Sequence, residues 1–257
     1  MNTLLLILSL LPIFVILLYI YRKDKYQKEP LRLLLKCLLF GAIAAFAIMS
    51  LPIPNNFHTS SMIANSFLQA FLSAAIPEEF VKYLFLYILI WYNKNFDEYF
   101  DGIVYATFIS LGFAGIENIM YVFSAEGFAQ SLYVSFTRAI ISVPAHFLFA
   151  VSMGYYFSLA KFNPSKRAKY LWLSFLTAVL LHGTFDFILF LTDELSISEN
   201  TTLATLLSLA FYFFDFWLWK KGLKLIREHA RLSSLQNDEL MSQNNSEVDD
   251  NDFEINN

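Results

Sequence analysis

Long runs of apolar residues separated by short polar segments dominate the pattern along the chain. Each run reaches the roughly 17–25 residues that an α-helix needs to cross the hydrocarbon core of a bilayer. The runs predict membrane-spanning helices at residues 3–21, 31–51, 65–91, 102–123, 131–159, 170–191 and 203–219. We therefore expect an all-α fold, a polytopic membrane bundle of about seven transmembrane helices.

Composition supports an integral membrane protein. Hydrophobic residues make up 57% of the chain and charged residues 16%, below the roughly 25% charged residues of a soluble domain. The net charge of −4 gives no indication of nucleic-acid binding, because much of the acid lies in the polar segment 229–257. We expect that segment to be a disordered, acidic, cytoplasmic tail, and residues 1–228 to form one transmembrane domain. The single cysteine, Cys37, excludes an intramolecular disulfide.

The basic residues predict an orientation in the membrane. All of the 18 lysines and arginines except Lys82 and Arg138 lie in or next to the loops after the first, third and fifth runs, or behind the seventh. The loops on the opposite side contain none. Since loops rich in lysine and arginine stay in the cytoplasm, we expect the N-terminus outside and the C-terminus inside.

Several ionisable residues lie within the apolar runs. They are Glu78, Glu79, Lys82, Glu117, Arg138, His146, His182 and Asp186. Charges are costly in hydrocarbon, so such residues face a bundle interior or a water cavity and suggest a functional site. At 1.5 Å per residue, oppositely directed helices bring all of them except Arg138 and Lys82 to a similar depth. We expect the carboxylates and the two histidines to converge around one cavity.

Spacing along the helices adds detail to this hypothesis. His182 and Asp186 are four residues apart and share one helix face, as do Glu78 and Lys82. Pro77 and Pro144 precede parts of the cluster and predict kinks. The alternative is purely structural: ion pairs and a carboxylate-bound histidine that tie helices together.

Carboxylates and imidazoles in a cavity that admits water suit hydrolysis. A glutamate can act as general base on water and then protonate the leaving amine, and this mechanism needs no cofactor. Alternatively, His146, His182 and a carboxylate could hold zinc with one open position. The sequence contains neither HExxH nor GxSxG, so the usual zinc-protease and serine-hydrolase spacings are missing. Metal dependence stays open at this point.

Two further functions compete with hydrolysis. A transporter or proton channel could use the same groups as a relay, but a relay predicts polar residues along the whole pore rather than at one depth. A non-catalytic scaffold or immunity protein is the other alternative, and the full set of ionisable residues argues against it.

Four motifs in order resemble one family of membrane enzymes. They are Glu78-Glu79-Phe80-Val81-Lys82, Phe113 with Glu117, Arg138 with His146, and His182 with Asp186. Over about residues 22–190 the chain resembles the PrsW-type intramembrane proteases, a family similar in turn to the membrane CAAX prenyl endopeptidases. Lys82, Glu117 and Asp186 stand where the prenyl endopeptidases have Arg, His and Asn, which favours PrsW over a prenyl-protein endopeptidase.

The resemblance implies a multi-pass peptidase in the cytoplasmic membrane of a bacterium. It implies a single-span membrane protein as substrate, an anti-sigma factor that is cut in the first step of regulated proteolysis. The implied catalytic residues are Glu78, Glu79, Glu117, His146, His182 and Asp186, with Lys82 and Arg138 in support. We expect one glutamate of the pair, Glu78 in preference, to activate water.

Overall fold

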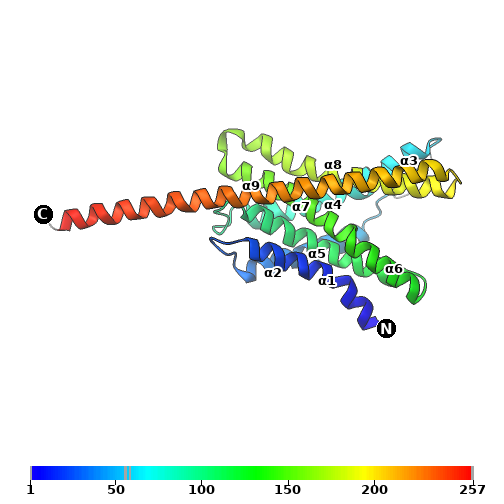
Figure 1. Cartoon of the computed structure of the whole chain (residues 1–257), viewed down its shortest axis with the longest axis horizontal. Helices are drawn as coiled ribbons and strands as arrows, with labels where there is room; N and C mark the ends of the chain where they lie inside the picture. Colours follow the sequence, from blue (N-terminus) through cyan, green and yellow to red (C-terminus); the bar gives the residue numbers. More distant parts are fainter. Residues whose placement is uncertain (1, 55–56, 58, 256–257) are drawn as a thin grey trace.

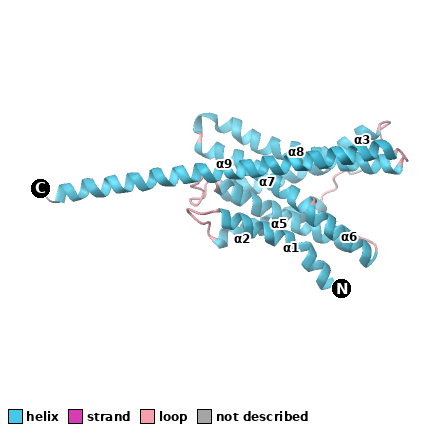
Figure 2. Ribbon diagram, viewed as in Figure 1, coloured by secondary structure: helices cyan, strands magenta, loops and turns pink. Residues whose placement is uncertain are grey.

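The protein is a bundle of helices joined by short loops (Figure 2). The computed structural model describes residues 2–54, 57 and 59–255, with side chains up to residue 243, and contains no strand in these ranges. The helices are α1 (Asn2–Lys23), α2 (Leu31–Ser50), α3 (Met62–Leu68), α4 (Ile76–Ile90), α5 (Asp101–Ser124), α6 (Gly127–Ile140), α7 (Ser142–Phe162), α8 (Arg167–Ile197) and α9 (Thr201–Ile255), with a π-helix at Gln69–Ala75 and a 3₁₀ turn at Pro164–Lys166.

The predicted membrane bundle is confirmed. In the described ranges, six helical stretches are long and apolar enough to cross a bilayer: α1, α2, α5, α6 with α7, α8 and α9. The third predicted span is also present, as α3, the π-helix and α4 in direct succession. Many large apolar side chains of α1, α2 and α9 are exposed, which is what helices facing lipid require.

Helices α5 and α7 form the centre of the bundle. Most residues of both helices are buried, and α5 packs against α1, α2, α4 and α7 while α7 packs against α8 and α9. The outer helices cover this pair on several sides (Figure 1). Because α5 and α7 are enclosed by protein rather than lipid, they can carry polar side chains at membrane depth.

Two glycines bring the backbones of α2 and α5 into contact. A Cβ atom on Gly41 would lie 1.9 Å from the carbonyl oxygen of Ile109, and a Cβ on Gly112 would lie 2.0 Å from that of Leu38. Small residues at such crossings let membrane helices approach closely. The contact fixes α5 one and a half turns before Glu117.

Two of the predicted spans are interrupted near prolines. The π-helix ends at Ala75, two residues before Pro77, and α6 ends at Ile140, four residues before Pro144. Proline lacks an N–H group and its ring conflicts with the carbonyl four residues earlier, which accounts for the break at Ile141. π-Helical turns are rare and occur frequently at functional sites.

Helix α9 includes most of the segment after residue 228, for which the sequence predicts a disordered tail. It continues as a helix to Ile255, and His229 and Ser233 are buried. His229 Nε2 lies 2.9 Å from the carbonyl oxygen of Tyr155, and the backbone N–H of Phe100 donates to Ser233 Oγ over 2.9 Å. These contacts attach the first part of this polar segment to the bundle. The 55 residues of α9 span about 82 Å, and the helix extends well beyond the bundle (Figure 1).

Candidate active site

Helix α4 contributes two carboxylates and a lysine whose ammonium group contacts both. Lys82 Nζ donates to Glu79 Oε1 over 2.8 Å and to Glu78 Oε2 over 3.2 Å. The lysine side chain is 1% exposed and its Nζ lies 4.1 Å from the centre of the Phe113 ring. Because residues three and four apart share a helix face, one ammonium can neutralise both glutamates.

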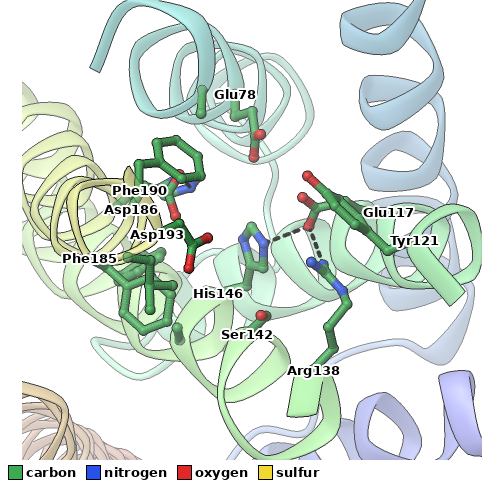
Figure 3. A pocket seen from close by; sticks show the side chains of 15 residues that line it. Glu78, Glu117, Tyr121, Arg138, Ser142, His146, Phe185, Asp186, Phe190 and Asp193 are labelled. Atoms are coloured by element: carbon green, nitrogen blue, oxygen red, sulfur yellow. Dashed lines mark hydrogen bonds and ion pairs between the residues drawn. The ribbon is translucent and has the colours of Figure 1, made fainter. Parts of the chain in front are cut away.

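Glu117 on α5 joins two helices through a single oxygen. Its Oε2 accepts a hydrogen bond from Arg138 Nη2 on α6 over 2.8 Å and lies 2.8 Å from His146 Nε2 on α7. Figure 3 shows both contacts as dashed lines, with the arginine and the histidine approaching the carboxylate from different directions. The break at Ile141 therefore does not separate Arg138 from His146, because both converge on Glu117.

Helix α8 places His182 between two carboxylates. His182 Nδ1 lies 2.9 Å from Glu79 Oε1 and Nε2 lies 3.1 Å from Asp186 Oδ2. The imidazole stacks on the Phe149 ring with centroids 5.0 Å apart and planes 17° apart. The ring is therefore held by polar contacts at both nitrogens and by packing on one face.

A contact between Lys82 and His146 joins these groups into one network. Lys82 Nζ lies 3.3 Å from His146 Nδ1. The network unites all eight residues singled out from the sequence, and they come from α4, α5, α6, α7 and α8. Buried charges of this kind are stable only when paired, and the network supplies the pairs.

A cavity of about 240 Å³ borders the network. Six of the eight network residues line the cavity wall: Glu78, Glu117, Arg138, His146, His182 and Asp186. Glu79 is fully buried behind that wall and contacts Lys82 and His182. Figure 3 shows the Glu78 carboxylate pointing toward the space that His146 and Glu117 face from the other side. The structure thus distinguishes the two adjacent glutamates.

Sequence reasoning missed three polar residues of the site. Asn118 is fully buried, accepts from Arg138 Nε over 2.9 Å and donates to the backbone oxygen of Ser9 over 2.6 Å. Tyr121 lies under the Arg138 guanidinium, 4.2 Å from ring centre to Cζ, and Asp193 lines the cavity. Their spacing was a usable signal for two of them, since Asn118 follows Glu117 directly and Tyr121 is one turn further.

The fold and the site define a polytopic membrane protein with a carboxylate–imidazole centre enclosed by its helices. Comparison with known proteins identifies the family within this class. The chain matches the model of the PrsW family intramembrane metalloproteases over residues 29–217. No solved structure matches it.

Curated relatives agree with this match. The chain is 43% identical over 171 residues to Protease PrsW of Geobacillus kaustophilus, covering 66% of this chain and 73% of that protein. It is 42% identical over 186 residues to Protease PrsW of Clostridioides difficile, covering 71% and 78%. The corresponding protein of Bacillus subtilis is 38% identical over 179 residues, covering 69% and 79%.

The chain therefore belongs to the PrsW family of intramembrane metalloproteases. It is a multi-pass membrane protein and a membrane-embedded peptidase. Membership in this family favours the peptidase over the transporter and prenyl-protein alternatives.

The family description implies a metal, and the residues present fit one. Glu78, Glu79, His146 and His182 each offer a donor atom within 4.8 Å of the others, and carboxylate and imidazole donors suit zinc. Oε2 of Glu79 is buried without a hydrogen-bond partner in the described part of the chain, so this oxygen is free to act as a ligand. Lys82 contacts three of the four residues and competes with a metal for the same donors.

Proposed function

We propose that this peptidase hydrolyses a peptide bond in a single-span membrane protein and that Glu78 is the general base. One observation carries the proposal: of the two adjacent glutamates, only Glu78 lines the cavity, while Glu79 is enclosed by Lys82 and His182. A general base must reach the water that it deprotonates. In this proposal Glu78 takes a proton from water as the water attacks the peptide carbonyl carbon.

The same carboxyl group then serves the second half of the reaction. The proton on Glu78 passes to the nitrogen of the leaving amine as the C–N bond breaks, which returns Glu78 to its carboxylate form. Lys82 lies 3.2 Å from Glu78 Oε2 and supplies a fixed counter-charge throughout. Such proton transfer by a positioned side chain contributes about 10²–10⁴-fold to the rate.

The remaining residues have proposed roles around the developing negative charge. His182, whose ring Asp186 and Phe149 hold in place, stabilises the oxyanion of the tetrahedral intermediate through the positive charge of its protonated ring, since both ring nitrogens already contact carboxylates. Fixed charges near such an oxyanion act strongly in a site that excludes water. Glu117 shares the water, since it lies on the opposite cavity wall and its own position is set by Arg138 and His146.

A bound metal would add to this chemistry. His146, His182 and one glutamate of the pair would hold it, and it would act as a Lewis acid that polarises the scissile carbonyl. The chain's own residues keep their tasks of orienting the peptide and moving protons.

The proposed substrate is a single-span membrane protein of the anti-sigma factor type. Membership in the PrsW family and the four motifs that match its pattern support this choice. The cavity lies between helices that face lipid on their outer sides, which suits a substrate that arrives within the bilayer.

Cleavage in proteoliposomes tests the proposal. The wild-type chain, Glu78→Gln and the control Glu126→Gln are each reconstituted with a single-span anti-sigma factor. Glu126 is an exposed glutamate just before α6, so its variant makes the same chemical change away from the cavity. We expect cleavage by the wild type and Glu126→Gln, and none above background by folded Glu78→Gln. Cleavage by Glu78→Gln at the wild-type rate would refute the assignment of the base.

A further inference from the structure

A second group of buried carboxylates lies at the opposite end of α5 from Glu117. Asp24 follows α1, Glu98 belongs to the loop before α5, and Asp101 is the first residue of α5. They are 1%, 2% and 0% exposed. Each offers an oxygen within 4.8 Å of those of the other two. Like charges gathered without solvent repel each other strongly, so this arrangement calls for a compensating charge.

Four oxygens of this acidic cluster (Asp24, Glu98 and Asp101) lack a partner. Asp24 Oδ1, both carboxylate oxygens of Glu98 and Asp101 Oδ1 are buried and make no hydrogen bond within the described ranges. None of the three residues belongs to an ion pair in those ranges.

Backbone amides fix the other oxygens of the cluster in place. Asp24 Oδ2 accepts from the N–H of Glu29 over 3.2 Å. Asp101 Oδ2 accepts from the N–H groups of Asp97 and Glu98 over 3.0 and 2.6 Å. Asp24 and Asp101 are therefore each held by one oxygen while the other stays free and enclosed, which is the geometry of preorganised ligands. Both oxygens of Glu98 stay free.

We propose that Asp24, Glu98 and Asp101 bind a hard divalent cation, Mg²⁺ or Ca²⁺. All available donors are oxygens, which both ions prefer. Two ligands on opposite sides of Ca²⁺ are about 4.6–5.2 Å apart, twice the usual Ca–O distance. Oxygens within 4.8 Å of one another can therefore all reach one ion after small adjustments, with water completing the coordination.

The electrostatics of the cluster support a bound cation. Glu29 adds a fourth carboxyl group beside Asp101 and accepts a hydrogen bond from the Tyr105 hydroxyl. A cation removes the repulsion that this crowding creates.

A cavity of about 310 Å³ gives a hydrated ion access to the cluster. Asp24 and Glu98 both line it. Lys23, Lys25 and Arg231 line it too and are exposed, so the cavity reaches the surface of the molecule. The ion does not need to cross the bundle.

The ion would connect three parts of the chain at this end of the bundle. Its ligands come from the loop after α1, the loop before α5 and α5 itself. The α9 segment lies against the same loops, because Tyr26 donates to Ser234 over 2.9 Å and Phe100 N–H donates to Ser233.

The acidic cluster lies far from the candidate active site. Glu117 lies 16 residues (117 − 101) beyond Asp101 on α5, about 24 Å along the helix. The inference is therefore independent of the proposed catalytic function.

Isothermal titration calorimetry tests the site on the full chain in detergent after removal of metals with EDTA. MgCl₂ and CaCl₂ are titrated separately into the wild type, Glu98→Gln, Asp24→Asn and the control Asp97→Asn. Asp97 is exposed and adjacent to Glu98, so its variant removes the same charge without removing a ligand. Glu78→Gln is added because it alters the catalytic centre only.

We expect saturable binding of one or both cations to the wild type, Asp97→Asn and Glu78→Gln. Glu98→Gln and Asp24→Asn should each weaken binding more than about tenfold, because even the loss of an outer partner of a metal ligand costs about 10–100-fold. Preference for one cation identifies the physiological ion class. Absence of saturable binding to the wild type would overturn the proposal and leave carboxyl groups that share protons. Equal affinity of the wild type and a folded ligand variant would overturn it as well.

Discussion

Lys82 is the residue on which the candidate active site depends most. Its ammonium group contacts Glu78, Glu79 and His146, and its side chain is almost completely buried. Without it, two adjacent carboxylates would be enclosed with His182 alone opposite them. Removing one partner of a buried ion pair is costly because the other charge is left uncompensated.

We predict that Lys82→Met lowers the free energy of unfolding by about 3–5 kcal/mol. Methionine has a similar length, so lost packing contributes little. Unfolding of the detergent-solubilised chain followed by circular dichroism measures the change. Lys36→Met is the control, since Lys36 is exposed on α2 and surface substitutions usually stay within about 0.5 kcal/mol. Equal stabilities of the two variants would contradict the role given to Lys82.

The residues that converge in the structure could be picked out from the sequence because ionisable side chains are conspicuous in apolar runs. The pairs within one helix, Glu78 with Lys82 and His182 with Asp186, followed from their spacing, but the contacts between helices did not. Glu79 contacts His182 and Glu117 contacts His146, and these choices depend on how each helix is rotated. The acidic cluster escaped prediction for another reason. Asp24, Glu98 and Asp101 lie in or beside polar loops, where acidic residues are ordinary, and only the fold shows that they are buried.

At the scale of elements, the contact between α2 and α5 helps to position Glu117 in the candidate active site. Gly112 brings its helix against the Leu38 carbonyl, and Glu117 lies five residues further along α5. A side chain at this contact has no flexible neighbour that could move aside, because the obstructing atoms belong to the backbone.

We predict that Gly112→Ala destabilises the fold by about 1–3 kcal/mol, the usual range for overpacking a close contact, and lowers peptidase activity because α5 shifts. Gly115→Ala is the matched control: its Cβ would first meet Ile13 Cδ1 at 3.3 Å, the end of a flexible side chain. Thermal unfolding and the cleavage assay measure both effects. A Gly112→Ala variant as stable and active as Gly115→Ala would show that the helix contact tolerates displacement.

The interrupted helices show how much of the helix pattern could be predicted from the sequence. Pro77 and Pro144 predicted disturbances near the site, and interruptions are present close to both. The π-helical form at Gln69–Ala75 could not be predicted, because it depends on one additional residue per turn being accommodated by packing against α8. The ordered part of α9 likewise depends on tertiary contacts such as that of His229 with Tyr155.

For the whole molecule, the orientation in the membrane stays a prediction. The basic residues gather in the loops after α1, α4 and α7 and along α9, while the loops after α2, α5 and α8 contain no lysine or arginine. With an odd number of crossings, the two ends of the chain lie on opposite sides. The acidic cluster then lies on the cytoplasmic side, where Mg²⁺ is abundant.

Reporter fusions measure this orientation. Alkaline phosphatase, active only outside the cytoplasm, should be active when fused after Ser198 and inactive when fused after Pro164. A fluorescent reporter that folds only in the cytoplasm should give the opposite pattern. Phosphatase activity at Pro164 together with none at Ser198 would invert the topology.

The central claim is that the Glu78 carboxylate, exposed to the cavity, activates the water that hydrolyses the peptide bond. The most direct test measures the single-turnover cleavage rate and the metal content of the same Glu78→Gln preparation beside the wild type. We predict a rate at least about 10²–10⁴-fold lower in a folded variant whose metal content equals that of the wild type. A wild-type rate would contradict the claim, and a loss of rate that accompanies a loss of bound metal would make Glu78 a ligand instead of the base.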